Sequence, residues 1–136
     1  MLALLCLTGC GAADDGVYTV GVCQLMVHDS LDQATQGFAD ALNAQMTEAG
    51  HTVEIDIQVA GEEAYCPTVI NTFTAKKVDL IMANATPALL AAANATTTIP
   101  VLGTSVTDYA TAMGVTEGWT GVTGVNISGT SDLAPL

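Results

Sequence analysis

The sequence predicts an α/β fold in which a parallel sheet carries helices on both faces. Short apolar segments rich in valine and isoleucine alternate with longer segments of helical periodicity. The spacing between the apolar segments leaves room for the right-handed crossovers that parallel strands require. With 136 residues, of which 50% are hydrophobic, the chain can bury the core of one domain.

The first strand and the first helix follow one another near the N-terminus. Residues 18–24 are apolar and rich in β-forming residues, which indicates a strand. Ser30 and Gln33 then have the spacing of a capping box, and apolar residues recur at helical intervals as far as Gly50. We therefore predict a helix over residues 31–49.

The second strand and the second helix have equally clear patterns. Residues 52–59 alternate strictly between polar and apolar, which predicts a strand with one wet face at the edge of the sheet. Pro67 suits the first turn of a helix, and an apolar stripe follows it. Lys76 and Lys77 would complement the negative end of that helix.

Two more strand and helix pairs complete the pattern. Residues 79–83 predict the third strand, and Thr86 opens an alanine-rich helix. Residues 99–103 predict the fourth strand, after which Asp108 is a suitable cap for a short helix. A further short strand is expected within residues 118–132.

The charge of the chain excludes some classes of partner. Two lysines stand against 14 carboxylates, so the formal net charge is −12. Such a surface repels phosphate backbones and anionic lipid headgroups, which argues against nucleic-acid binding. Solubility is the simpler interpretation of the same acidity.

Enzyme, cofactor and metal motifs are not found in the sequence. It has no G-x-G-x-x-G, no Walker loop and no G-x-S-x-G elbow, and His28 and His51 lack evident nucleophile partners. No C-x-x-C or H-x-x-x-H spacing predicts a metal site. We expect neither catalysis nor a cofactor.

The first ten residues end in LTGC, which resembles the lipobox of bacterial lipoproteins. In that interpretation, residues 1–9 are part of a signal peptide, Cys10 is the lipidated residue, and residues 10–16 form a flexible tether. The folded part would then be residues 17–136. An ordinary apolar N-terminus with a chance match is the alternative.

Cys23 and Cys66 are the cysteines left for the folded part of the chain. Cys23 closes the predicted first strand, and Cys66 begins the predicted second helix. Neighbouring β-α units bring these two positions to the same edge of the sheet. They can therefore form a disulfide in an oxidising exterior, or they can be two buried free thiols.

Five segments in order resemble the N-terminal lobe of an ABC-transporter substrate-binding protein, in the type 1 periplasmic-binding branch associated with tryptophan or tyrosine uptake. They are YTVGVCQL (18–25), ATQGFADAL (34–42), VDLIMANATPA (78–88), IPVLGTSVTDY (99–109) and NISGTSD (126–132). The resemblance implies a two-lobed receptor that closes on its ligand and presents it to a membrane permease, which works with an ATPase. The chain would be the first lobe, truncated at its C-terminus, with the second lobe absent.

The predicted ligand-binding residues follow the first, third and fourth strands, because parallel strands end at one edge of the sheet. An amino-acid zwitterion needs an anion cradle, for which the helix start at Thr86 is suited, and a counter-charge, for which Asp108 is suited. The predicted ligand contacts are Gln24, His28, Asn84, Ala85, Thr86, Thr104, Ser105, Thr107, Asp108 and Tyr109, and Ser131 and Asp132 are the predicted hinge residues.

Several of these residues also have a simpler interpretation. His28 can be an exposed loop residue, Thr86 and Asp108 can be helix caps, and Tyr109 can belong to the core.

The lipobox and the family resemblance together imply a bacterial, extracytoplasmic and lipid-anchored component of an ABC importer that binds an amino acid, with an aromatic side chain favoured. The alternative function is a ligand-sensing module of a signalling receptor that uses the same fold.

Overall fold

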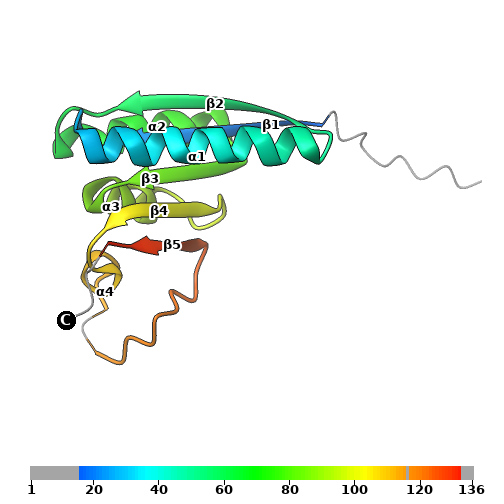
Figure 1. Cartoon of the computed structure of the whole chain (residues 1–136). Coiled ribbons are helices and arrows are strands. Elements are labelled where there is room, and N and C mark those ends of the chain that lie inside the picture. The colour runs from blue at the N-terminus through cyan, green and yellow to red at the C-terminus, as the bar shows by residue number, and fades with distance from the viewer. Residues whose placement is uncertain (1–15, 116, 133–136) are drawn as a thin grey trace, which may run out of the picture.

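The computed structural model describes residues 16–115 and 117–132, which form a five-stranded parallel sheet in the order β2-β1-β3-β4-β5 (Figure 1). The strands are β1 (Val17–Gln24), β2 (Thr52–Val59), β3 (Leu80–Asn84), β4 (Val101–Val106) and β5 (Ile127–Ser131). Each pair of neighbouring strands is parallel. The predicted α/β class and the edge position of β2 are both confirmed.

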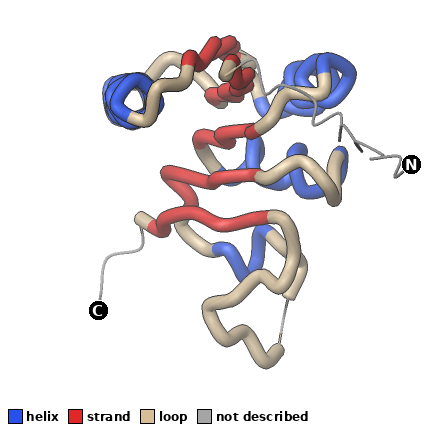
Figure 2. The backbone as a smooth tube through the Cα atoms, turned by 90° about the vertical axis from the view of Figure 1, so that its right-hand side faces the viewer, coloured by secondary structure: helices blue, strands red, loops and turns tan. Residues whose placement is uncertain are grey.

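Helices cover both faces of this sheet, as Figure 2 shows in an edge-on view. The helices are α1 (Asp29–Glu48), α2 (Cys66–Lys76), α3 (Thr86–Ala95) and α4 (Tyr109–Ala112), with a 3-10 turn over Glu63–Tyr65 before α2. Helix α1 lies on one face, and α2 and α3 lie on the other (Figures 1 and 2). Within the described residues, no helix is both long enough and apolar enough to cross a membrane.

The alternation of side chains along β1 divides the core between these two faces. Val20 and Val22 pack with Met82 under α1, in the smaller of two apolar clusters. The larger cluster lies on the α2 and α3 face and includes the fully buried ring of Phe73. Gly21 faces this ring, and a Cβ there would overlap it. The absence of a side chain at Gly21 thus lets α2 approach β1 closely.

Helix α1 begins two residues earlier than the capping box predicted. Its N-cap is His28, whose Nδ1 accepts a hydrogen bond from the backbone N–H of Ser30 at 3.3 Å. Ser30 therefore lies in the first turn, and the prediction that it caps the helix is wrong. The cap of α4 is confirmed, since Asp108 accepts from the backbone N–H of Thr111 at 3.2 Å.

The third and fourth strands begin and end later than predicted. Asp79 lies directly before β3, where its carboxylate accepts hydrogen bonds from the backbone N–H and the hydroxyl of Thr19 at 2.7 and 2.9 Å. Strand β4 continues to Val106 because it pairs with β3 on one side and β5 on the other. Asn84, Thr104 and Ser105 therefore lie within the strands and not in the loops that were predicted to follow them.

The two lysines lie at the end of α2, as predicted for a helix C-terminus. Lys76 Nζ also contacts Asp56 Oδ2 at 2.7 Å, and the hydrogen bond from Lys76 holds the pKa of that carboxyl below its usual range. Lys77 ends the helix in the left-handed conformation, with φ 55°.

Some predictions concern residues that the structure does not describe. The predicted signal peptide (residues 1–9) and the lipidated Cys10 lie outside the described residues, as does the predicted tether except for Gly16.

Candidate functional site

All five strands end at one edge of the sheet, which we call the strand-end edge. The connection after β1 crosses one face through α1, and the connection after β3 crosses the other face through α3. Open α/β sheets bind ligands at the strand ends where successive connections leave in opposite directions, and the ends of β1 and β3 are that place in this sheet. A backbone hydrogen bond of 3.2 Å from Leu25 N to Asn84 O joins these two strand ends.

Two non-glycine residues at this edge have positive φ. They are Ala85, directly after β3, with φ 97°, and Ser105, near the end of β4, with φ 55°. The backbone N–H of Ala85 donates to Thr104 O at 3.0 Å, so the two strained positions are adjacent. Each such residue costs on the order of 1–3 kcal/mol, and such residues cluster at ligand sites. The strain therefore makes this edge the candidate functional edge.

Helix α3 points its N-terminus at the same edge. Its N-cap is Ala85, no side chain caps its first turn, and Pro87 occupies one of the first two helical positions. The backbone N–H groups of a first turn carry partial positive charge, so they form a site for a carboxylate. Thr86, the first residue of the helix, is half-buried there.

Gln24 and Asn84 lie at the edge as predicted, but their side chains are buried beneath it. Thr35 of α1 donates to Gln24 Oε1 at 2.6 Å, and Asn84 Nδ2 donates to Thr35 Oγ1 at 2.9 Å and to Leu31 O at 2.8 Å. Gln24 Nε2 donates to Asp32 Oδ1 at 2.6 Å. This network fastens α1 to the ends of β1 and β3 and so supports the edge from below.

Apolar side chains are exposed at the edge, and the sequence analysis did not single them out. Met26 and Val27, in the loop after β1, are 41% and 78% exposed, and Tyr65, in the turn after β2, is 57% exposed. The two loops are adjacent, because Gly61 N donates to Leu25 O at 2.8 Å. The signal in the sequence was an apolar triplet immediately after a strand, at residues 25–27.

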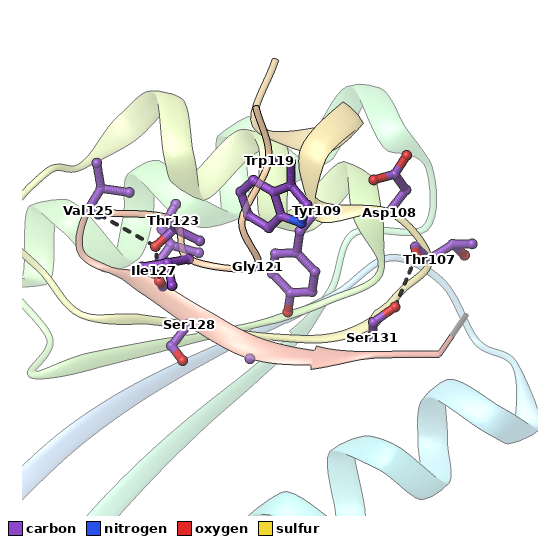
Figure 3. Close-up of a pocket in the computed structure, with 13 residues that line it drawn as sticks. Thr107, Asp108, Tyr109, Trp119, Gly121, Thr123, Val125, Ile127, Ser128 and Ser131 are labelled. Carbon is purple, nitrogen blue, oxygen red and sulfur yellow. Dashed lines mark hydrogen bonds between the residues drawn. The ribbon is translucent and has the colours of Figure 1, made fainter. Parts of the chain in front are cut away.

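A second hollow, of about 700 Å³, runs beside β5 and is shown in Figure 3. It brings together Thr107, Asp108, Tyr109 and Ser131, which the sequence predicted, and it adds Trp119, which the sequence analysis missed. This groove lies along the length of β5 rather than between the ends of β1 and β3.

Tyr109 packs against β4 and β5, as its simpler interpretation required. Its hydroxyl donates to Thr130 O at 3.3 Å and fills the space beside Gly103 and Gly129. Burial raises the pKa of this phenol above its usual value. The half-buried ring therefore supports β5 and also lines the hollow beside it.

The remaining predicted residues do not gather in one place. Ser105 is half-buried at the strand-end edge, and Thr104 lines a cavity of about 390 Å³ on the α1 face. His28 and Asp108 are exposed caps, and the hydrogen bond from the Thr111 side chain lowers the pKa of Asp108.

The predicted hinge residues extend the pairing of β5 with β4. Ser131 Oγ donates to Thr107 O at 3.0 Å, and Asp132 N donates to Val106 O at 3.1 Å. No group of three or more histidine, cysteine or acidic residues in the described part of the chain is arranged to hold a metal ion.

Ala85→Gly is expected to raise the free energy of unfolding by ~1 kcal/mol. Glycine relieves roughly 1–3 kcal/mol of strain and caps a helix better than alanine. The greater conformational entropy of the unfolded glycine variant offsets about 0.4–1 kcal/mol of this gain in stability. Ala41→Gly, on the exposed side of α1, should instead lower it by about 1 kcal/mol. Urea unfolding of both variants measures these changes. A lower free energy of unfolding for Ala85→Gly would contradict the claim that Ala85 is strained.

Comparison with known proteins adds a family model and several relatives. Residues 19–136 match the model described as ABC transporter substrate binding protein. A tyrosine-binding protein of Clostridioides difficile (strain R20291) is 40% identical over 116 residues, which are 83% of this chain and 32% of that protein. The chain thus spans about a third of the length of this curated relative.

Solved structures agree with this match. A ligand-free, open substrate-binding protein with adhesive properties from Clostridium difficile has a TM-score of 0.76 and 36% identity, and the match covers 86% of this chain and 39% of that one. An ABC domain in complex with L-Trp from Streptococcus pneumonia has a TM-score of 0.72 and 31% identity, with 85% and 39% covered. A conserved domain protein from Vibrio cholerae has a TM-score of 0.75 and 32% identity, with 87% and 40% covered.

Proposed function

Because this chain belongs to the family of ABC-transporter substrate-binding proteins, we propose that it forms one lobe of an extracytoplasmic receptor for an amino acid, with an aromatic side chain favoured. The receptor would deliver its ligand to a membrane permease and its ATPase, and Cys10 would carry the lipid anchor. The tyrosine-binding relative and the neighbour solved with L-Trp support the choice of ligand.

The observation that carries the proposal is the strained strand-end edge beside the uncapped start of α3. The ligand carboxylate would accept hydrogen bonds from the first-turn amides of α3 and from the hydroxyls of Thr86 and Ser105. The exposed side chains of Met26 and Tyr65 would contact its apolar part. One edge thus offers both polar and apolar contacts, as an amino acid with a large side chain requires.

The charge of the chain favours a zwitterion over a multiply charged anion. The formal net charge is −12, and the two lysines lie at the far end of α2, so the described residues of the strand-end edge include no lysine or arginine. A phosphate ester or a dicarboxylate would meet a repulsive field there. A zwitterion carries no net charge, and its ammonium is attracted by the same field.

Calorimetric titration with the twenty amino acids tests the proposal. It should be carried out on this chain and on the complete protein that its reading frame encodes. We expect heat of binding for tyrosine or tryptophan in the complete protein, and weaker binding to this chain because one lobe contacts only one side of a ligand. No binding of any amino acid by the complete protein would contradict the proposal.

Ser105 offers a sharper test within the site. Ser105→Gly and Ser105→Ala both remove the hydroxyl and should weaken binding up to about 10-fold, the equivalent of one hydrogen bond of roughly 0.5–1.5 kcal/mol. Only the glycine variant relieves the positive φ, so it alone should resist urea as well as or better than the unsubstituted protein. Unchanged affinity in Ser105→Ala would exclude the hydroxyl as a ligand contact.

A further inference from the structure

Cys23 and Cys66 lie in the same apolar cluster on the α2 face of the sheet. Cys23 is the seventh residue of β1, and Cys66 is the first residue of α2. Both are free thiols with 0% exposure, within the larger apolar cluster. They are close enough for a side-chain hydrogen bond between them to affect the pKa of each.

Backbone hydrogen bonds hold the end of β1 beside the chain that leads to Cys66. Ala60 N donates to Gln24 O, and Gly61 N donates to Leu25 O, each at 2.8 Å, so the chain after β2 runs beside the end of β1. The 3-10 turn Glu63–Tyr65 then directs Cys66 back toward the sheet. Both thiols therefore lie in the core between the end of β1 and the start of α2.

We propose that Cys23 and Cys66 form an intramolecular disulfide when the chain is exposed to an oxidising exterior. Among the described residues, no third histidine, cysteine or acidic side chain joins the two thiols in a group that could hold a metal ion. The pair is therefore better suited to a disulfide than to a metal. Substrate-binding proteins of ABC transporters are extracytoplasmic, and disulfides persist in that environment. The bond is independent of which ligand the protein binds.

The oxidant is an external disulfide, and the reaction is thiol–disulfide exchange. The thiolate of one cysteine attacks a sulfur of the external disulfide and releases one small thiol, leaving a mixed disulfide. The thiolate of the other cysteine then attacks the protein sulfur of that mixed disulfide and releases the second small thiol. Two protein thiols are oxidised to one disulfide, and one small disulfide is reduced to two thiols.

Both thiols react slowly while the fold is closed. Burial, with the neighbouring Cys66 thiol, raises the pKa of Cys23 to about 12, and burial also raises the pKa of Cys66. Few thiolates exist at neutral pH, and exchange needs a thiolate that a reagent can reach. The disulfide therefore forms during folding, or when the first turn of α2 opens.

The bond would fasten one side of the strand-end edge. It joins the end of β1, which leads to Met26, to the turn that carries Tyr65. It also closes a loop over residues 23–66, which restricts the unfolded chain. The cross-link would therefore stabilise the fold and hold these two apolar side chains in a fixed relation.

A direct test uses the 136-residue chain with Cys6→Ser and Cys10→Ser, so that only this pair can react. The protein is refolded in a mixture of reduced and oxidised glutathione, denatured, alkylated and cleaved after glutamate. Glu48, Glu54, Glu62 and Glu63 lie between the two cysteines, so a disulfide leaves two peptides joined by one bond. We expect the joined peptides and no alkylated cysteine.

Thermal unfolding of the same oxidised protein provides the second measurement. Its Tm should fall by ~10 °C after reduction, because the loop constraint is lost. Cys66→Ser is the matched control and should have one Tm with and without reductant. Two alkylated cysteines after refolding in the oxidising mixture, or a higher Tm after reduction, would overturn the proposal.

Discussion

Replacing Gly129 with alanine is expected to lower the free energy of unfolding by roughly 3 kcal/mol. Gly129 lies in the middle of β5 with φ 154°, paired with Gly103 of β4. A Cβ at this position would overlap the carbonyl oxygen of Gly103 and the hydroxyl of Tyr109. A backbone atom cannot rotate away as a flexible side chain can, so β5 would have to separate from β4.

Urea unfolding and amide hydrogen exchange in β4 measure this loss together. The matched control is Gly37→Ala, on the exposed side of α1, where a Cβ meets no atom within 4 Å. There alanine should raise the free energy of unfolding by about 0.5–1 kcal/mol, because glycine is the poorer helix former. The same chemical change thus has opposite signs at the two positions. Equal stability of Gly129→Ala and the unsubstituted protein would show that β5 does not pack in this way.

Asn84→Asp is expected to cost about 3–5 kcal/mol at neutral pH. The change places a carboxylate oxygen where the buried Nδ2 now donates to Leu31 O and Thr35 Oγ1. The new charge would be fully buried with no cation near it, since both lysines lie at the other end of the sheet. Asn84 Oδ1 already has no hydrogen-bond partner within the described residues, so the network cannot absorb a second unpaired acceptor.

The loss should depend on pH in a defined direction. Burial raises the folded-state pKa of the introduced carboxyl above its unfolded value of about 3.9, because it disfavours the charged form. The variant is then closest to the unsubstituted protein below pH ~4, and its deficit grows as pH rises through the folded-state pKa. Asn71→Asp, on the exposed side of α2, should change stability by less than about 0.5 kcal/mol at any of these pH values. A deficit that is independent of pH would contradict burial of the charge.

The order and type of the elements could be predicted because each has a complete local pattern. Strict alternation gave β2 its observed bounds, Thr52–Val59, and its place at the edge. Asp108 was recognisable as the cap of α4 from its position alone. The start of α1 was predicted two residues too late, because His28, Asp29 and Ser30 can each accept a hydrogen bond from a first-turn amide and tertiary packing selects among them.

The site could be predicted as an edge but not as a set of side-chain directions. Gln24 and Asn84 stand at strand ends, and the sequence correctly places them there. Gln24 follows Val20 and Val22 with a period of two, so its side chain faces α1. Only the packed fold shows that Thr35 of α1 is its hydrogen-bond partner. The positive φ of Ala85 and Ser105 could not be predicted, since neither residue type favours it.

The position of the two lysines has a practical consequence. Lys76 and Lys77 are exposed at the end of α2, which runs back from the strand-end edge toward the starts of the strands. Covalent coupling through lysine amines would therefore attach the protein to a sensor surface by its opposite side. Every molecule attached in this way would turn its strand-end edge, where α3 begins, toward the solution.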